Sequence, residues 1–157
     1  MNDEQLLRLR ADIAADPVLS GYPATSDGAY AIADAYNTVV GKAPAPTMVT
    51  ARTVLSELGM AGAIALDKLE AAGSSNPVVR WAVKFLTGEG LDVGHPMSQS
   101  MLDQLAQAGV VTATEASALK ALALQDQTRA EALLAPWRGR LSYQDVERAR
   151  SLTVEVA

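Results

Sequence analysis

Apolar residues recur at helical spacing along most of the chain, and this pattern predicts eight helices. Near the N-terminus, Leu6, Leu9 and Ile13 lie three or four residues apart and therefore share one helix face. Prolines, glycines and capping residues with short polar side chains mark where each apolar series begins and ends. The predicted helices cover residues 3–15, 26–36, 50–58, 60–73, 78–86, 97–109, 112–135 and 142–149.

The segment 78–86 is the most apolar of these helices. Its sequence, VVRWAVKFL, is interrupted only by Arg80 and Lys84. A helix that is apolar around most of its circumference is typical of a core position. We therefore predict that this helix is the central one of the core.

Two segments between and after these helices decide the domain organisation. Residues 87–96 contain Gly88, Gly90, Gly94 and Pro96, so they predict a loop that is the main internal joint of the chain. Residues 151–157 favour an extended conformation because apolar and polar residues alternate there. Such a tail could pair with another chain. A linker is predicted at residues 41–46.

Composition supports an all-α fold. The chain has 157 residues, of which 29 are alanine and 19 leucine, whereas only 4% are aromatic. Alanine and leucine are strong helix formers, and aromatic and β-branched residues are what sheets need. We predict one domain over residues 1–150, a compact bundle of seven to eight short helices followed by an extended C-terminal tail.

Charge and cysteine content exclude several classes of site. With no cysteine and one histidine, the chain has no disulfide scaffold, no thiol nucleophile and no site built from several Cys or His ligands, and we expect neither metal nor cofactor. The net charge of −5 gives no basic field for nucleic acid. No apolar run is long enough for a signal peptide or a membrane span, so we expect no membrane association of that kind.

Two local patterns carry possible chemistry. His95 could act as a general base or a pH switch, but Gly94-His95-Pro96 is also typical of a turn into a helix, and that loop or cap role is preferred. Thr87-Gly88-Glu89-Gly90 resembles part of a phosphate-binding loop, yet a third glycine and the following lysine are missing. No residue is therefore assigned a catalytic role, and we predict that the protein is not an enzyme.

Basic and aromatic residues gather near the C-terminus. Such a mixture can contact nucleic-acid strands or phosphates, or it can form a face between subunits. Because Asp145 and Glu147 dilute the charge, the intersubunit face is preferred. The candidate interface residues are Trp137, Arg138, Arg140, Tyr143, Arg148 and Arg150, with Val154 and Val156 of the tail.

Four segments carry a resemblance to known proteins. They are LLRLRADIAADPVLSGY (residues 6–22), SDGAYAIADAYN (26–37), QTRAEAL (127–133) and LSYQDVERAR (141–150). With the apolar segment 78–86 they cover about half of the chain, and residues 38–76 match nothing. In this layout the chain resembles a family of small, Ala-rich helical proteins encoded among the structural genes of tailed bacteriophages and prophages.

The resemblance implies a non-enzymatic virion subunit and supplies no catalytic residues. The expected place is the head–tail joint, as a connector or adaptor, or the tail, and the expected partners are portal, connector or tail subunits. A homo-oligomeric ring or another multi-copy assembly is expected in the virion, after synthesis in the host bacterial cytoplasm.

Two other functions remain open at this point. A soluble helical assembly chaperone or regulatory binding module could present a helical groove to a peptide. An enzyme would have to rely on His95 and scattered carboxylates.

Overall fold

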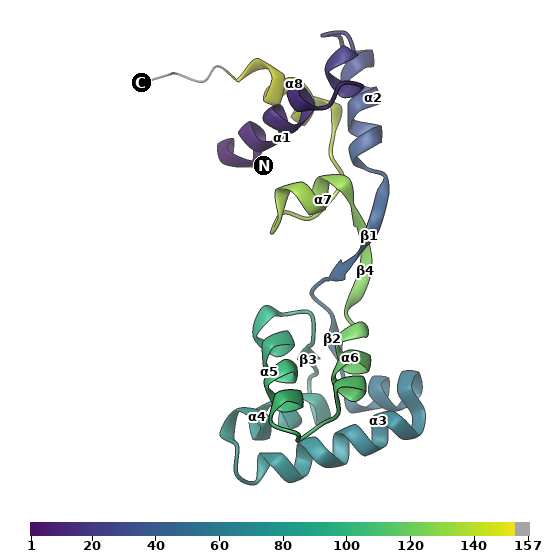
Figure 1. Ribbon diagram of the computed structural model, residues 1–157, viewed down its shortest axis with the longest axis vertical. Coiled ribbons are helices and arrows are strands. Elements are labelled where there is room, and N and C mark those ends of the chain that lie inside the picture. The colour runs from purple at the N-terminus through teal and green to yellow at the C-terminus, as the bar shows by residue number, and fades with distance from the viewer. Residues whose placement is uncertain (153–157) are drawn as a thin grey trace. The chain divides into compact units, whose positions relative to one another are not determined.

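The computed structural model describes residues 1–152, and it confirms the all-α fold class (Figure 1). Over these residues the chain forms eight α-helices, one short 3-10 helix and four short strands. In chain order they are α1 (Asp3–Ala15), η1 (Leu19–Gly21), α2 (Ser26–Tyr36), β1 (Val39–Pro44), β2 (Met48–Val49), α3 (Ala51–Gly73), α4 (Pro77–Thr87), β3 (Leu91–Asp92), α5 (Pro96–Gln107), α6 (Ala113–Ala121), β4 (Leu124–Thr128), α7 (Arg129–Leu134) and α8 (Tyr143–Ser151).

The chain divides into two compact units. Unit 1 combines Met1–Gly41 with the described chain from Asp126 onward, and unit 2 is the continuous segment Lys42–Gln125. The chain passes between the units within β1 and β4, which are neighbours in one two-stranded sheet. The joint predicted at residues 87–96 lies inside unit 2. A single domain over residues 1–150 stays a prediction.

Unit 1 forms because the two ends of the chain supply complementary apolar faces. α1 opens with a capping box in which the side chains of Asn2 and Gln5 bond each other's backbone N–H groups. Its apolar stripe packs against α7 and α8, which in turn pack against α2. The buried residues of this core are Leu6, Leu9, Ile13, Leu19, Ala29, Ile32, Ala33, Tyr36, Ala130, Leu134, Leu141, Val146 and Ala149.

Unit 2 is built from helices that follow one another along the chain. α3 packs against α4, and α5 packs against α6. The short strands β2 and β3 pair in antiparallel register, with Met48 opposite Asp92 and Val49 opposite Leu91. The buried residues of this core are Val49, Val54, Ala65, Leu69, Val79, Leu86, Val93, Leu102, Leu105, Val111, Ala116, Leu119 and Ala123.

The predicted break at Gly59 is confirmed. This glycine has φ 56° and ψ −131°, which interrupts the helical dihedral angles inside α3. Residues with a side chain rarely adopt a positive φ, so glycine is the natural residue for the kink. The predicted segments 50–58 and 60–73 are therefore two helical pieces joined by a sharp bend.

The prediction of one long helix over residues 112–135 is wrong. α6 ends at Ala121, strand β4 occupies 124–128, and α7 begins at Arg129. The helix is broken for two reasons, of which one is local and the other involves a distant part of the chain. Thr128 and Glu131 form a capping box that starts a new helix, and β4 finds a strand partner in β1, which also replaces most of the linker predicted at 41–46.

The prediction that residues 78–86 form the central core helix is also wrong. Only one side of α4 is buried, through Val79, Ala82 and Leu86. Its other apolar side is exposed to solvent. The apolar arc of α4 is wider than its neighbours in unit 2 cover, which makes this helix a surface element. The predicted tail lies mostly outside the described residues, since 153–157, with Val154 and Val156, are not described.

Candidate interaction surface

The solvent-facing side of α4 is an apolar surface of unit 2 that contains both of its exposed large aromatic residues, Trp81 and Phe85. Val78, Trp81 and Phe85 follow one another at helical spacing and are 62%, 56% and 46% exposed. We call these three residues the α4 stripe. Scattered single apolar residues are ordinary on protein surfaces, but a contiguous apolar stripe marks a place of contact with another molecule.

Positive charge borders the α4 stripe. The Lys84 Nζ atom lies 4.4 Å from the centroid of the Trp81 ring, a cation–π contact. Arg80 and Lys84 are the charged residues of α4, and neither forms an ion pair with another described residue. The helix therefore presents aromatic surface together with two uncompensated cations.

An apolar groove continues from the α4 stripe along α5. It has a volume of about 520 Å³, and Val78 belongs to both the stripe and the groove. We call it the α4–α5 groove. None of its nine lining residues carries a charge; they are Asn76, Val78, Met97, Ser100, Met101, Gln104, Leu105, Ala108 and Val110. Met97 is 74% exposed at its rim.

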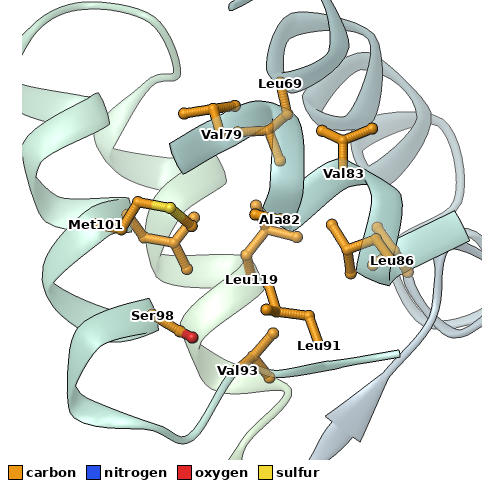
Figure 2. A pocket seen from close by; sticks show the side chains of 12 residues that line it. Leu69, Val79, Ala82, Val83, Leu86, Leu91, Val93, Ser98, Met101 and Leu119 are labelled. Carbon is orange, nitrogen blue, oxygen red and sulfur yellow. The ribbon is translucent and has the colours of Figure 1, made fainter. Parts of the chain in front are cut away.

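A second hollow in unit 2 is apolar and too small to bind a ligand. Its volume is about 20 Å³, and Figure 2 shows Val79, Ala82 and Leu119 around it. Ser98 is the polar residue among the twelve that line it. A space of this size holds about one water molecule at most, and apolar cavities of this kind stay dry. It is a packing defect of the unit 2 core.

The two local patterns with possible chemistry have structural roles. His95 is the N-cap of α5, and its Nδ1 atom accepts a hydrogen bond of 3.1 Å from the backbone N–H of Met97, as the turn pattern predicts. The backbone N–H groups of Gly88 and Gly90 both donate to the carbonyl of Phe85, which ends α4. The glycine segment leads into strand β3 and not into a helix, unlike a phosphate-binding loop.

The candidate interface residues of the C-terminal region lie in unit 1, and three of them serve its packing. Trp137 is half-buried against the unit 1 core. Tyr143 stacks on Tyr30, with ring centroids 4.2 Å apart. The Arg150 guanidinium donates to the backbone carbonyls of Pro23 and Tyr22 at 2.8 and 2.7 Å. These contacts hold α8 to the turn before α2.

The other three basic residues are more exposed. Arg138 lies 3.9 Å from Glu131, and Arg140 lies 3.8 Å from Asp34. Arg148 is exposed near the end of α8. The Arg140–Asp34 pair is exposed on both sides, and exposed pairs at such distances contribute little to stability, so Arg140 can change partners at low cost. The proposed interface at this place stays a prediction.

A polar cluster fixes α1 to α2 and α7 in unit 1. The Tyr36 hydroxyl donates to Asp12 Oδ2 at 2.5 Å, and Arg129 donates to Asp12 and Asp16 at 2.9 and 3.0 Å. Burial, followed by the hydrogen bond to Asp12, raises the pKa of the Tyr36 phenol well above its usual range. Hydrogen bonds from the Leu19 backbone and Arg129 lower the pKa of Asp16. Every member is paired, so the cluster is structural.

Residues 1–152 contain neither a cluster of metal ligands nor a membrane-spanning helix. The described carboxylates and His95 do not gather into a group of three or more that would hold a metal ion. No described helix combines the length and the apolar content needed to cross a membrane.

Comparison with protein families, curated proteins and solved structures finds no match to this chain.

Sequence reasoning found the caps but not the α4 stripe or the groove. A signal for the stripe was present, because Val78, Trp81 and Phe85 form one apolar line beside a second line of Val79, Ala82 and Leu86. Two apolar lines need two covering neighbours, and the sequence does not show which neighbours exist. The groove depends on α4 lying beside α5, which the sequence does not reveal.

Proposed function

We propose that this protein is a non-enzymatic structural subunit of a tailed-phage virion that acts through protein–protein interfaces. The observation that carries the proposal is the α4 stripe, three exposed apolar residues beside two unpaired cations. In the intact particle this surface is covered by another protein. The phage assignment is supported by the resemblance of residues 6–37 and 127–150 to small Ala-rich proteins encoded among phage structural genes.

The proposed place is the head–tail joint or the tail, where the partners are portal, connector or tail subunits. A homo-oligomeric ring, or another assembly of several copies, would bring many such surfaces together. Contacts around a ring are heterologous, so a surface of unit 2 need not match itself across a two-fold axis.

The α4–α5 groove favours a second candidate function, a helical assembly chaperone or regulatory module that binds a peptide. Its apolar lining and two methionines suit an adaptable binding surface. Both candidates use the same face of unit 2. They differ in whether the protein remains in the finished particle.

Mass spectrometry of gradient-purified particles from cells that produce the encoding phage tests the proposal. A structural subunit is recovered at a fixed copy number relative to the major capsid protein. Abundance in infected cells together with absence from particles would instead establish the assembly factor.

A matched pair of variants tests the surface itself. Trp81→Asp places a charge in the α4 stripe and is expected to remove the protein from particles. Val18→Asp makes the same kind of change at a 69% exposed residue of unit 1 and is expected to leave incorporation unchanged. Normal incorporation of the Trp81→Asp protein would contradict the proposal.

A further inference from the structure

We infer that two copies of this chain exchange their N-terminal parts by straightening helix α3 at Gly59. In the exchanged dimer, the residues up to 58 of each copy pack on the residues from 60 onward of the other copy. The structure fixes the identity of the partner, because the segment that a second copy brings is identical to the segment that fills the same place within one chain. The inference goes beyond the proposed function and concerns the chain in solution.

The hinge of this exchange is a single exposed residue. Gly59 has φ 56° and ψ −131°, close to the angles of the first central residue of a type II′ turn, a position that glycine dominates. A Cβ atom placed on Gly59 would meet no atom within 4 Å, so packing does not require a glycine there. Residues 55–61 are exposed apart from the half-buried Leu58, so the bend lies at the surface. The backbone angles of the bend are therefore the reason for a glycine at this position.

Apart from this turn, α3 is suited to form one continuous helix. Its two pieces consist mostly of alanine, leucine and other strong helix formers. A helix that stops and starts again leaves carbonyl and N–H groups at the break without helical partners, and Gly59 has no side chain that could cap the second piece. Straightening restores these backbone bonds. The bend is therefore held by the contacts of residues 50–58 with the rest of unit 2 and not by local helix preference.

One contact that holds the bend passes through Gly62, which is buried. A Cβ atom on Gly62 would lie 2.7 Å from the Val54 carbonyl oxygen, so the two pieces of α3 approach at a distance that only glycine allows. In a straight helix, the eight steps from Val54 to Gly62 span about 12 Å. The contact is therefore lost within a chain whose α3 is straight, and the same residues of a second copy restore it.

The apolar stripe of α3 stays in phase across the bend. Its members follow one another at intervals of four, four, three and four residues, and they are Val54, Leu58, Gly62, Ala65 and Leu69. In a straight helix these positions fall within an arc of about 80°. Val54 and Gly62 then face the same side. Two straight helices that cross at this point place the Val54 of each copy on the Gly62 of the other.

The exchange also preserves the other contacts across the hinge. Strand β2 precedes Gly59 and pairs with β3 after it, with Val49 opposite Leu91. In unit 1, α1 and α2 precede the hinge, and α7 and α8 follow it. Because both copies have the same sequence, each of these contacts forms again between chains. The exchanged dimer therefore differs from two monomers mainly in the hinge conformation and in the entropy of association.

Replacing the hinge glycine with alanine is expected to favour the exchanged dimer. Alanine is strained at a positive φ and stabilises a straight helix, so Gly59→Ala is expected to lower the dissociation constant of the full-chain dimer at least about tenfold. Sedimentation equilibrium measures it. Gly109→Ala is the matched control, because Gly109 has φ 73° and equally open space but lies between α5 and α6, outside any helix. Its association is expected to equal that of the wild type.

A cysteine pair distinguishes the exchanged dimer from any other dimer. The chain has no cysteine, and the opposed Val49 and Leu91 lie on either side of the hinge. Opposed residues of antiparallel strands are about 4.5–5.5 Å apart at Cα, a distance that a disulfide spans. In Val49→Cys combined with Leu91→Cys, oxidation joins two chains in the exchanged dimer, whereas the disulfide stays within one chain in a monomer or in a dimer formed by outer surfaces.

A denaturing gel without reducing agent separates these products. We expect covalent dimers when the cysteine pair is combined with Gly59→Ala. With Gly59 in place, we expect a share of covalent dimers that rises with the protein concentration at which the chain is oxidised.

Three results would overturn the inference. They are wild-type association of Gly59→Ala, a dimer whose disulfides all stay within single chains, and equal association of Gly109→Ala, which would assign the effect to backbone strain in general. If Gly59→Ala does not fold, the cysteine pair in the chain with Gly59 decides, and covalent monomers at every concentration would overturn the inference. Gly59 does not belong to the α4 stripe, so none of these results changes the outcome of the particle experiment.

Discussion

The two units hold their helices together by different kinds of contact. Unit 1 joins segments from both ends of the chain, and polar contacts between distant residues tie them. The Asn37 side chain both donates to the carbonyl of Leu141 and accepts from its N–H, at 2.9 and 2.8 Å, and Arg129 reaches Asp12 and Asp16. These bonds fix the geometry of contacts more than 100 residues apart in the chain.

The main helix pairs of unit 2, α3 with α4 and α5 with α6, follow one another in sequence and pack through apolar residues. Two ion pairs cross between its helices, Lys68 with Glu115 and Lys120 with Asp103. Local contacts cost less chain entropy to close than distant ones, so they need fewer directional bonds. The comparison shows that a locally connected unit can leave an apolar helix side exposed for a partner and still possess a core.

The largest effect is expected from separating the two units. A fragment of residues 42–125 contains every element of the unit 2 core, so we expect it to fold alone with a cooperative thermal transition. A fragment of residues 1–41 lacks α7 and α8 and is expected to be unfolded. Circular dichroism of both fragments measures this. An unfolded 42–125 fragment would show that unit 2 depends on unit 1.

A redesigned chain provides the converse experiment. Residues 42–125 are replaced by a short turn, which joins the two parts of unit 1 where β1 and β4 are neighbours and where the Arg129 N–H donates to the Thr38 carbonyl at 3.0 Å. Unit 1 is expected to fold in this chain.

Core truncations in each unit are expected to have the next largest effects. Leu134→Ala in unit 1 and Leu69→Ala in unit 2 each remove a buried side chain, at a cost of about 2–5 kcal/mol in the free energy of unfolding. The fluorescence of the two tryptophans reports the unfolding of each unit separately, since Trp137 lies in unit 1 and Trp81 in unit 2. Replacing one tryptophan with phenylalanine leaves the other as the fluorescent reporter during unfolding in urea.

We expect each truncation to shift the midpoint of its own unit only. Equal shifts of both reporters would mean that the units unfold together. That outcome would remove the distinction between them and support the single domain predicted from sequence over residues 1–150.

The caps show what the sequence could predict. Short polar residues were expected to open the predicted helices, and the side chains of Asn2, Thr50, Asn76, Thr112 and Ser142 each accept a hydrogen bond from a backbone N–H in the first turn. A cap depends on residues two or three positions away, so the information is local. The role of His95 was predictable for the same reason.

The errors concern residues whose partners lie far along the chain. Residues 124–128 were predicted as helix, but their strand partner β1 is about 80 residues earlier in the sequence, and propensity alone does not reveal it. The α4 stripe was predicted to be buried because its composition is that of a core helix. Composition reports how much apolar surface a helix has and not how many neighbours cover it.

A smaller effect is expected from removing the Tyr36 hydroxyl, and it tests whether unit 1 depends on its polar cluster. The phenol donates to the Asp12 carboxylate, so Tyr36→Phe is expected to cost about 1–2 kcal/mol near neutral pH. Because the pKa of Tyr36 is raised in the folded state, its contribution is complete below the unfolded tyrosine pKa of about 10 and is lost as the pH rises above it.

Urea unfolding followed through Trp137 at several pH values measures this dependence. The wild-type chain is expected to lose stability above about pH 10, and Tyr36→Phe is expected to reduce that loss. The exposed Tyr22 supplies the control variant Tyr22→Phe, for which we expect the wild-type slope. If the free energy of unfolding of Tyr36→Phe fell with pH as steeply as that of the wild type, Tyr36 would not cause the loss of stability at alkaline pH.

The smallest effect is expected in unit 2, and its sign is opposite. Ser98 is 8% exposed beside the small apolar cavity, and its hydroxyl bonds no described residue but is not fully buried. Ser98→Ala breaks no hydrogen bond within the described chain and improves helix propensity, so we expect stabilisation by about 0.5 kcal/mol. Unfolding followed through Trp81 measures it, with exposed Ser100→Ala on the same helix as the propensity control. Destabilisation of Ser98→Ala beyond that control would mean that the hydroxyl holds a water molecule in the cavity, and that unit 2, like unit 1, uses a buried polar contact. Stabilisation would show that the Ser98 hydroxyl contributes nothing to the stability of the unit 2 core.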